Sequence, residues 1–350
     1  MIRLPVSIGE AVDKLTILDI KTKRITNPEK VAYCKAEYDL LYAELKPFVE
    51  SIPFYYKQLY DVNDLIWVMQ DEIRACPDPQ KCVDILDKND MRFRIKDIIN
   101  RSVNSEIREQ KGYPVRRAMV LHHLGLGDHV GMIGAVRYIA LQHDETRVLC
   151  KQCNAANVRS FFADDPRIKI IEIPPVNGHY PQQIHYNRDQ YTNVYLSGCY
   201  CAAPHSYDDL PRGFYLDMGM NPEIRHTHFY VPTTESAKSM HAALRDIPYR
   251  FVQQTSSSHT TPLVTWDINE VLTIDPNTNL YPEGHPWHEI AAACVNKPFL
   301  DYTEVIRHAQ EIHTVESSFY CLACYIKPEA TVKRCYSRET GAFIPTYDFT

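Results

Sequence analysis

The stretch that decides the fold is residues 115–140, which read VRRAMVLHHLGLGDHVGMIGAVRYIA. A short apolar run from Ala118 to Leu121 is followed by two histidines and by Gly125-Leu126-Gly127-Asp128. The apolar residues that come next recur at every third position, as on one face of a helix. The pattern predicts a strand, a tight glycine turn and a helix whose N-terminal N–H groups point toward a ligand.

Two kinds of polar residue surround this turn. Asp128 stands where the helix begins, so its carboxylate is either a helix cap or a positioned general base. His123 stands at the end of the strand, where ligands bind on parallel sheets. With Gly125 and Gly127 it is our candidate for contacts on the acceptor side of a site, or for shaping the turn. A buried core histidine is the alternative for this position and for His122.

Composition excludes several classes of function. The chain has 350 residues, 45% of them hydrophobic and 23% charged, and therefore more than one globular domain is expected. Its net charge of −6 gives no reason to expect a nucleic-acid partner. No apolar run is long enough for a membrane span, and Met1–Pro5 does not resemble a secretion signal. Eleven cysteines, an odd number, favour free thiols in a reducing compartment, so a cytoplasmic location is expected.

Residues 1–112 are predicted to form a helical domain. Ser7 and Glu10 make a capping box, and Asn27-Pro28 starts a second helix. That second helix has a heptad-like run of apolar residues between Val31 and Phe48. A third helix follows, and a fourth is expected from about Pro79 to Glu109. We expect this part to serve as a scaffold or to form a homo-oligomer through its helices.

A breaker cluster, Lys111 to Pro114, marks the first domain boundary. Strands then alternate with helices, which predicts two parallel sheets with right-handed crossovers. We expect a first Rossmann-like lobe over 113–225 and a second over 226–350, the two separated by a linker at Pro222–Pro232. The fold class is therefore α/β, with two Rossmann-like lobes after an all-α domain.

Two segments of the second lobe could face the Gly125–Asp128 turn across a cleft. Ser317 and Ser318 open a helix directly after a strand, and hydroxyl and N–H groups at such a position suit phosphate oxygens. A polar loop also follows a strand, and its candidate donor-binding residues are Gln253, Thr255 and Ser256.

The segment His123 to Asp128 resembles the first turn of GT-B glycosyltransferases, especially those similar to heptosyltransferases. Glu311 to Phe319 resembles their late strand-to-helix motif and the serine-rich motif of fucosyltransferases. The likeness covers about residues 115–340, and the N-terminal helices resemble a small uncharacterised module found near sugar-transfer proteins. The resemblance implies that Asp128 is the base and that Ser317 and Ser318 contact the diphosphate of a nucleotide sugar.

The sequence departs from this family at one place. Fucosyltransferases have an arginine-rich motif after the first strand of the donor lobe, but here that place reads Val252-Gln253-Gln254-Thr255-Ser256. Arg250, Lys297 or His259 could substitute for the missing arginine, or the donor lobe could be degenerate.

Cofactor chemistry is not expected from the sequence. There is no Asp-x-Asp pair to hold a metal ion, and the resemblance implies a reaction without metal or cofactor, apart from the nucleotide-sugar co-substrate. Cys150-x-x-Cys153 and Cys321-x-x-Cys324 leave a shared zinc site as a minor alternative.

The function predicted first is transfer of a sugar from a nucleotide-diphosphate donor to a glycan or small-molecule hydroxyl, with Asp128 as the base. The second hypothesis is an inactive GT-B-like scaffold that binds a sugar or nucleotide. A dinucleotide-dependent enzyme is disfavoured because Val130 occupies the place of the third glycine of the fingerprint.

Overall fold

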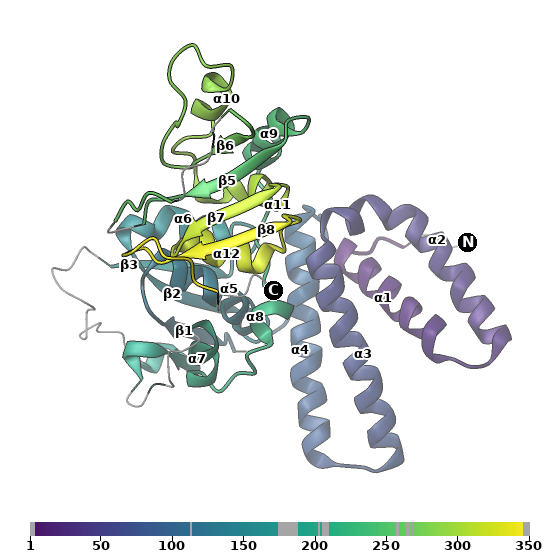
Figure 1. Cartoon of the computed structure of the whole chain (residues 1–350). Coiled ribbons are helices and arrows are strands. Elements are labelled where there is room, and N and C mark those ends of the chain that lie inside the picture. Colours follow the sequence, from purple (N-terminus) through teal and green to yellow (C-terminus); the bar gives the residue numbers. More distant parts are fainter. Residues whose placement is uncertain are drawn as a thin grey trace. The chain divides into compact units, whose positions relative to one another are not determined.

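The computed structural model of the chain describes residues 4–112, 114–173, 188–201, 204, 210–256, 259–263, 267 and 269–345. By its internal contacts the chain divides into two units (Figure 1). We call Met1–Arg117 together with Tyr138–Thr146 the helical unit. We call Ala118–Arg137 together with Arg147–Thr350 the α/β unit.

Four helices build most of the helical unit: α1 (Ile8–Arg24), α2 (Pro28–Ser51), α3 (Pro53–Ala75) and α4 (Pro79–Ser102). The predicted caps are present, since the Ser7 side chain accepts from the N–H of Glu10 at 3.2 Å and Asn27 accepts from Lys30 at 3.1 Å. The fourth helix ends before the predicted Glu109. The backbone leaves the helix at Asn104, whose φ is +51°.

The helical unit has its own apolar core, to which all four helices contribute. A buried polar cluster lies beside it. Asp13, only 1% exposed, accepts from Arg92 Nε at 2.8 Å and from Asn63 Nδ2 at 2.9 Å. These bonds tie α1 to α3 and α4. The buried core residues are Val12, Leu15, Leu45, Ile52, Tyr55, Leu59, Val62, Ile66, Met91, Ile95, Ile98, Ile99 and Leu141.

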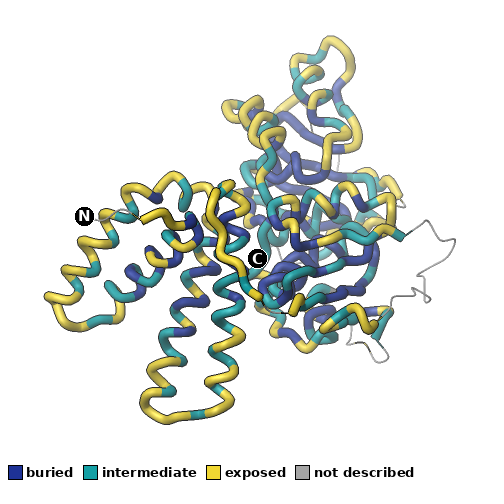
Figure 2. The backbone as a smooth tube through the Cα atoms, turned by 180° about the vertical axis from the view of Figure 1, so that it is seen from behind, coloured by how far each residue is buried: buried dark blue, intermediate teal, exposed yellow. Residues whose placement is uncertain are grey.

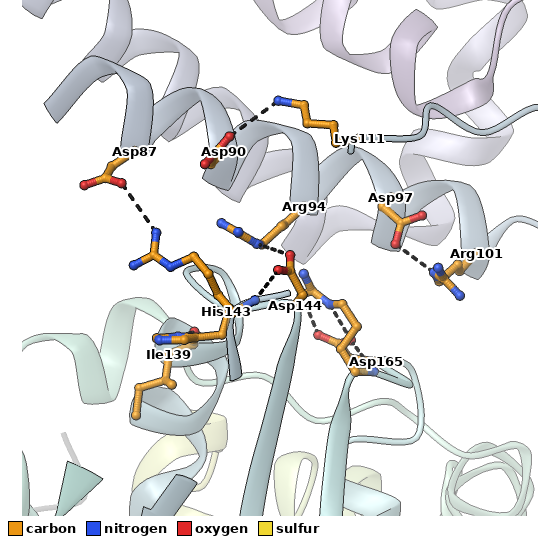
Figure 3. Close-up of polar contacts among 12 residues, drawn as sticks. Asp87, Asp90, Arg94, Asp97, Arg101, Lys111, Ile139, His143, Asp144 and Asp165 are labelled. Carbon is orange, nitrogen blue, oxygen red and sulfur yellow. Dashed lines mark hydrogen bonds and ion pairs between the residues drawn. The ribbon is translucent and has the colours of Figure 1, made fainter. Parts of the chain in front are cut away.

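The segment Tyr138–Thr146 belongs to the helical unit through contacts with α4 (Figure 3). Arg94, buried on α4, donates from Nε to Asp144 Oδ1 at 2.9 Å. The other oxygen of Asp144 accepts from the backbone N–H of Arg116 at 2.8 Å. His143 Nδ1 lies 2.9 Å from the carbonyl oxygen of Ile139. One carboxylate thus holds two backbone segments of the unit together.

The first sheet of the α/β unit has the strand order β3-β2-β1-β4. The chain moves outward from β1 to β3 and then returns to β4 on the other side of β1, where the two strands pair in parallel. The elements are β1 (Arg117–Leu121), α5 (Leu126–Ala140), β2 (Glu145–Lys151), η1 (Gln152–Asn154), α6 (Ala155–Phe161), β3 (Ile168–Ile173), η2 (Arg188–Gln190), β4 (Asn193–Leu196) and η3 (Gly198–Tyr200).

The second sheet has the order β6-β5-β7-β8, and its strands pair in parallel. Here too the chain first moves to one side of β5 and then to the other. The elements are α7 (Leu210–Asp217), α8 (Ile224–Thr227), α9 (Glu235–Leu244), β5 (Tyr249–Gln253), β6 (Leu272–Ile274), α10 (His288–Ala292), η4 (Phe299–Tyr302), α11 (Thr303–Arg307), β7 (Glu311–Val315), α12 (Ser318–Ile326) and β8 (Val332–Tyr336).

The predicted fold class is confirmed: two parallel α/β sheets follow a set of helices. The central strands β1, β5 and β7 are almost wholly buried, as expected for sheets covered on both faces (Figure 2). None of the helices in the described ranges is long and apolar enough to cross a bilayer.

Candidate active site

Each sheet reverses its strand order at one place, and the polar residues of interest lie at those two places. Ligands of open parallel sheets bind outside the carboxyl ends of the strands at such a switch point. In the first sheet the switch lies between β1 and β4, which end before His122 and Ser197. In the second it lies between β5 and β7, which end at Gln253 and Val315.

The Asp128 carboxylate lies in the first turn of α5 and is half-buried. Its Oδ2 accepts from the backbone N–H of Gly125 at 3.1 Å. It therefore reaches back to the residue before the helix, as the acidic member of a capping box does. Among the described residues, no hydrogen bond to the second oxygen, Oδ1, is found.

Burial raises the pKa of Asp128 above its usual value. The Coulomb interaction with His123, the Gly125 hydrogen bond and the charge of Lys151 act in the opposite direction. A half-buried carboxylate with a raised pKa in the first turn of a helix that follows a strand is a candidate general base. The same carboxylate also stabilises the start of α5, so the two roles predicted from the sequence are compatible.

His123 lies at the first switch point. Its Nε2 accepts from the backbone N–H of Cys199 at 3.1 Å, and its ring meets Phe214 edge-on at 4.9 Å. Gly198 makes this approach possible: its φ is +62°, and a Cβ there would lie 2.4 Å from His123 Nε2. This contact fixes the ring at the end of β1 and β4.

The neighbouring histidine has a different environment. His122 has no exposed surface, and its ring packs against His129 at a centroid distance of 4.5 Å. Burial lowers the pKa of His122 to about 4 and that of His129 well below its usual value. Both rings are therefore neutral at physiological pH. His122 is a core residue, the alternative that the sequence left open.

The second switch point joins Gln253 and Ser317. The Ser317 hydroxyl donates to Gln253 Oε1 at 2.6 Å and accepts from the N–H of Tyr320 at 3.4 Å, as the cap of α12. The side chain of Gln253 is buried and also donates to the carbonyl oxygen of Thr255. Ser318 is the first residue of α12 and is half-buried.

The two switch points meet at Gly127. A Cβ at this position would lie 3.2 Å from Cys321 Sγ, 3.6 Å from Ser318 Cα and 3.7 Å from Ser318 N. The first turn of α5, which contains Gly127, thus lies beside the first turn of α12. The charge of Asp128 also contributes to the raised pKa of the Cys321 thiol.

The remaining predicted donor-binding residues, Thr255 and Ser256, bond within their own loop. The hydroxyls of Thr255 and Thr260 lie 3.2 Å apart, and the Ser256 hydroxyl donates to the carbonyl oxygen of His259 at 3.1 Å. Residues 257 and 258 of this loop lie outside the described residues. The structure therefore brings Gln253 to Ser317, whereas the other two hydroxyls close a turn.

The three proposed substitutes for the missing arginine lie in different places. Arg250 is buried at the start of β5 and pairs with Glu311 at 3.5 Å, at the opposite end of the sheet from Gln253. Lys297 is exposed and donates its backbone N–H to the Tyr302 hydroxyl. His259 belongs to the turn with Ser256.

Two residues near the switch points were not singled out from the sequence. Lys151 ends β2, and its charge lowers the pKa of Asp128, so it supplies a cation near the first turn. Asp275 follows β6 beside β5 and accepts from Gln254 Nε2 at 3.2 Å and from Asn277 N at 2.8 Å. Burial raises its pKa. The sequence signal that could have identified Asp275 is its position about 20 residues after the first strand of a Rossmann-like lobe, where an acidic residue is common.

The α/β unit has two Rossmann-like lobes, and the chain is similar to solved glycosyltransferases. TibC, an iron-containing dodecameric glycosyltransferase of enterotoxigenic E. coli H10407, is 15% identical, with a TM-score of 0.39 over 65% of this chain and 61% of TibC. The TibC complex with ADP-D-beta-D-heptose is 14% identical, with a TM-score of 0.38 over 66% of this chain and 63% of that one. A family 9 glycosyl transferase of Veillonella parvula is 10% identical, with a TM-score of 0.38 over 61% and 78% of the two chains.

This chain thus spans about three fifths of the length of the TibC structures. No family model and no curated protein matches the sequence. The fold assignment itself rests on the order and direction of the strands described above.

The comparison corrects one expectation. We expected no cofactor, but TibC is described as iron-containing, so the likeness to this fold does not imply chemistry without a metal. In this chain the eleven cysteines are free thiols. Within the described ranges, no group of three or more histidine, cysteine, aspartate or glutamate side chains is arranged to hold a metal ion. No metal site is therefore assigned to the described residues.

Proposed function

We propose that this protein is a glycosyltransferase that moves a sugar from a nucleotide-diphosphate donor to a hydroxyl group, with Asp128 as the general base. The observation that carries the proposal is the proximity of Gly127 to Ser318 and Cys321, which a Cβ on Gly127 would meet at 3.2 to 3.7 Å. It sets a half-buried carboxylate of one lobe beside a helix start of the other, at the carboxyl ends of both sheets.

The roles follow from the chemistry of the transfer. The acceptor hydroxyl gives its proton to Asp128 while its oxygen attacks the anomeric carbon of the donor sugar. The bond between that carbon and the diphosphate oxygen breaks, and its electron pair leaves with the diphosphate. A positioned base contributes about 10²- to 10⁴-fold to such a step.

The first turn of α12 supports the donor side of this proposal. N–H groups at the start of a helix attract anions, and the leaving diphosphate gains negative charge. Ser318 adds a hydroxyl there, whereas the Ser317 hydroxyl is engaged with Gln253 and the helix cap. Ser317 and Gln253 would thus position the helix start. Asp275, buried at the end of β6, is our candidate for the donor ribose, by the general rule for Rossmann-like lobes.

The test uses Asp128→Asn, because an amide oxygen can still accept from Gly125. ADP-, GDP- and UDP-sugars are supplied in turn, and release of the nucleoside diphosphate is measured. We expect the wild type to release it from one donor class and the variant to be slower by about 10²- to 10⁴-fold in kcat. Asp78→Asn, at the cap of α4, is the matched control because its carboxylate also accepts a backbone N–H. Equal turnover by Asp128→Asn and the wild type would exclude the base role.

A second candidate is a protein that binds a sugar or nucleotide on this scaffold without turnover. The ion pair of Arg250 with Glu311 favours it, because this contact holds Arg250 at the start of β5, at the opposite end of the strand from Gln253. A thermal-shift screen with the same donors separates the two, since a ligand at 100 times its Kd adds about 2.7 kcal/mol. Stabilisation without release of diphosphate would favour the binding protein.

A further inference from the structure

Helix α2 has two apolar stripes, and the helical unit covers only one of them. The inner stripe includes Tyr38, Leu41, Leu45 and Phe48, which pack in the core of the unit. The outer stripe, which we define as Tyr33, Ala36, Leu40 and Ala43, is exposed along its whole length.

The outer stripe has the spacing of a coiled-coil contact. Its members follow one another at three, four and three residues, the alternation of a and d positions in a heptad. The large side chains are the most exposed: Tyr33 is 73% and Leu40 is 67% accessible. Pro47, inside the helix, lies one step beyond the last member. An apolar stripe of this kind, rimmed by charges, marks a helix that pairs with another helix.

The order of large and small residues selects the partner and its direction. If α2 pairs antiparallel with α2 of a second copy, Tyr33 faces Ala43 of the second copy and Leu40 faces its Ala36. Every layer then joins one large and one small side chain, so the helices approach evenly. Parallel pairing would place Tyr33 on Tyr33 and Leu40 on Leu40, with gaps at the alanine layers between them.

The flanking charges select the same direction. Antiparallel pairing sets Lys30 opposite Glu44 of the second copy, and the two-fold symmetry makes this pair twice. Neither side chain forms an ion pair within the described residues, so both are available. Parallel pairing would form no such opposite-charge pair, and it would set Asp39, which already pairs with Lys35 in its own chain, opposite Glu44.

Two like-charge contacts fall near the two-fold axis, and each is already compensated within its own chain. Glu37 would meet Glu37 of the second copy, but it pairs with Lys14 at 2.6 Å. Asp39 would meet Asp39, but it pairs with Lys35 at 2.5 Å. From the size order and the charges together, we propose that α2 joins two copies of this chain as an antiparallel helix pair through the outer stripe.

The contact is short. Tyr33 to Ala43 spans about 15 Å of helix, which is less than a standard interface needs for tight association. The dimer is therefore expected to dissociate at low micromolar concentrations and to form at high micromolar ones. It does not depend on the proposed sugar transfer.

The test is sedimentation velocity of the full chain over a range of micromolar concentrations. Leu40→Glu should weaken dimerisation by at least about tenfold in Kd, because it removes an apolar layer made twice and adds charge. Leu86→Glu is the matched control, since Leu86 is 66% exposed on α4 and lies outside the stripe. Circular dichroism of both variants checks that the helices are retained.

A charge exchange tests the direction of pairing. Lys30→Glu alone should weaken the dimer by about tenfold, because it sets glutamates opposite one another at two places. Adding Glu44→Lys should restore the wild-type Kd. In a parallel dimer the two positions lie about 21 Å apart along the axis, and the second change would restore nothing. A chain that stays monomeric at high micromolar concentration, or a dimer that Leu40→Glu leaves unchanged, would overturn the proposal.

Discussion

Because the His122 ring is buried, the free energy of unfolding of the α/β unit should decrease as the pH decreases. The pKa of His122 falls from 6.5 to about 4 because the side chain has no exposed surface. In the unfolded chain the same group takes up a proton below about pH 6.5. Between these two values the unfolded state binds more protons, so the free energy of unfolding decreases as the pH decreases.

The size of the effect follows from that shift. The difference between 6.5 and about 4 corresponds to about 3 kcal/mol in total, at about 1.4 kcal/mol for each pH unit. Of this, about 2 kcal/mol should be lost between pH ~7.5 and pH ~5, before most carboxylates are protonated. His129 acts in the same direction, since its pKa is lowered too.

The assay is urea unfolding of the full chain at several pH values, in a Trp67→Phe background. Fluorescence then comes only from tryptophans after residue 147 and follows the α/β unit. His122→Asn should flatten the dependence of stability on pH by about 2 kcal/mol over this range, whatever it costs in stability at pH ~7.5. The control His259→Asn, at an exposed position, should leave the slope unchanged. Equal slopes for His122→Asn and the wild type would refute the buried, neutral state of His122.

Three further predictions concern both units. If Asp128 is the base, kcat/KM should fall as the pH decreases through its pKa, with a midpoint above the usual 3.8, and Asp128→Asn should remove this acid limb. Gly127→Val should lower turnover by about 10²-fold by separating the two turns, while Gly131→Ala, whose new Cβ meets its nearest neighbour at 3.6 Å, should not. Arg92→Met should lower the free energy of unfolding of the helical unit by about 3 kcal/mol in urea, because Asp13 would remain as an uncompensated buried charge; a loss below about 1 kcal/mol would contradict this.

Local sequence determined the elements of this fold. Strand β3 ends directly before Pro174-Pro175 and β4 ends directly before Ser197-Gly198, so breaker residues in the sequence mark where these strands stop. Helix ends were less predictable: the fourth helix was expected to reach Glu109, but α4 ends at Ser102. Helices end where backbone groups find other partners, and such partners are mostly distant in sequence.

The candidate site, too, was predictable from the sequence only in part. Its positions at the strand ends were predictable, because the carboxyl ends of parallel strands share one edge. The sequence did not predict which side chains remain available at that edge. Arg250 lies in the apolar strand β5. It forms an ion pair with Glu311 because β5 pairs with β7 and places the two residues side by side.

The sequence by itself determined the helices, the strands and the two glycine- and serine-marked turns, because periodicity and capping act over a few residues. Only the tertiary structure decided that Gly127 lies beside the start of α12, that His122 is a neutral core residue while His123 lies at the switch point, and that one stripe of α2 stays exposed. Burial, and the pKa shifts that follow from it, depend on neighbours contributed by distant parts of the chain. No local pattern contains that information.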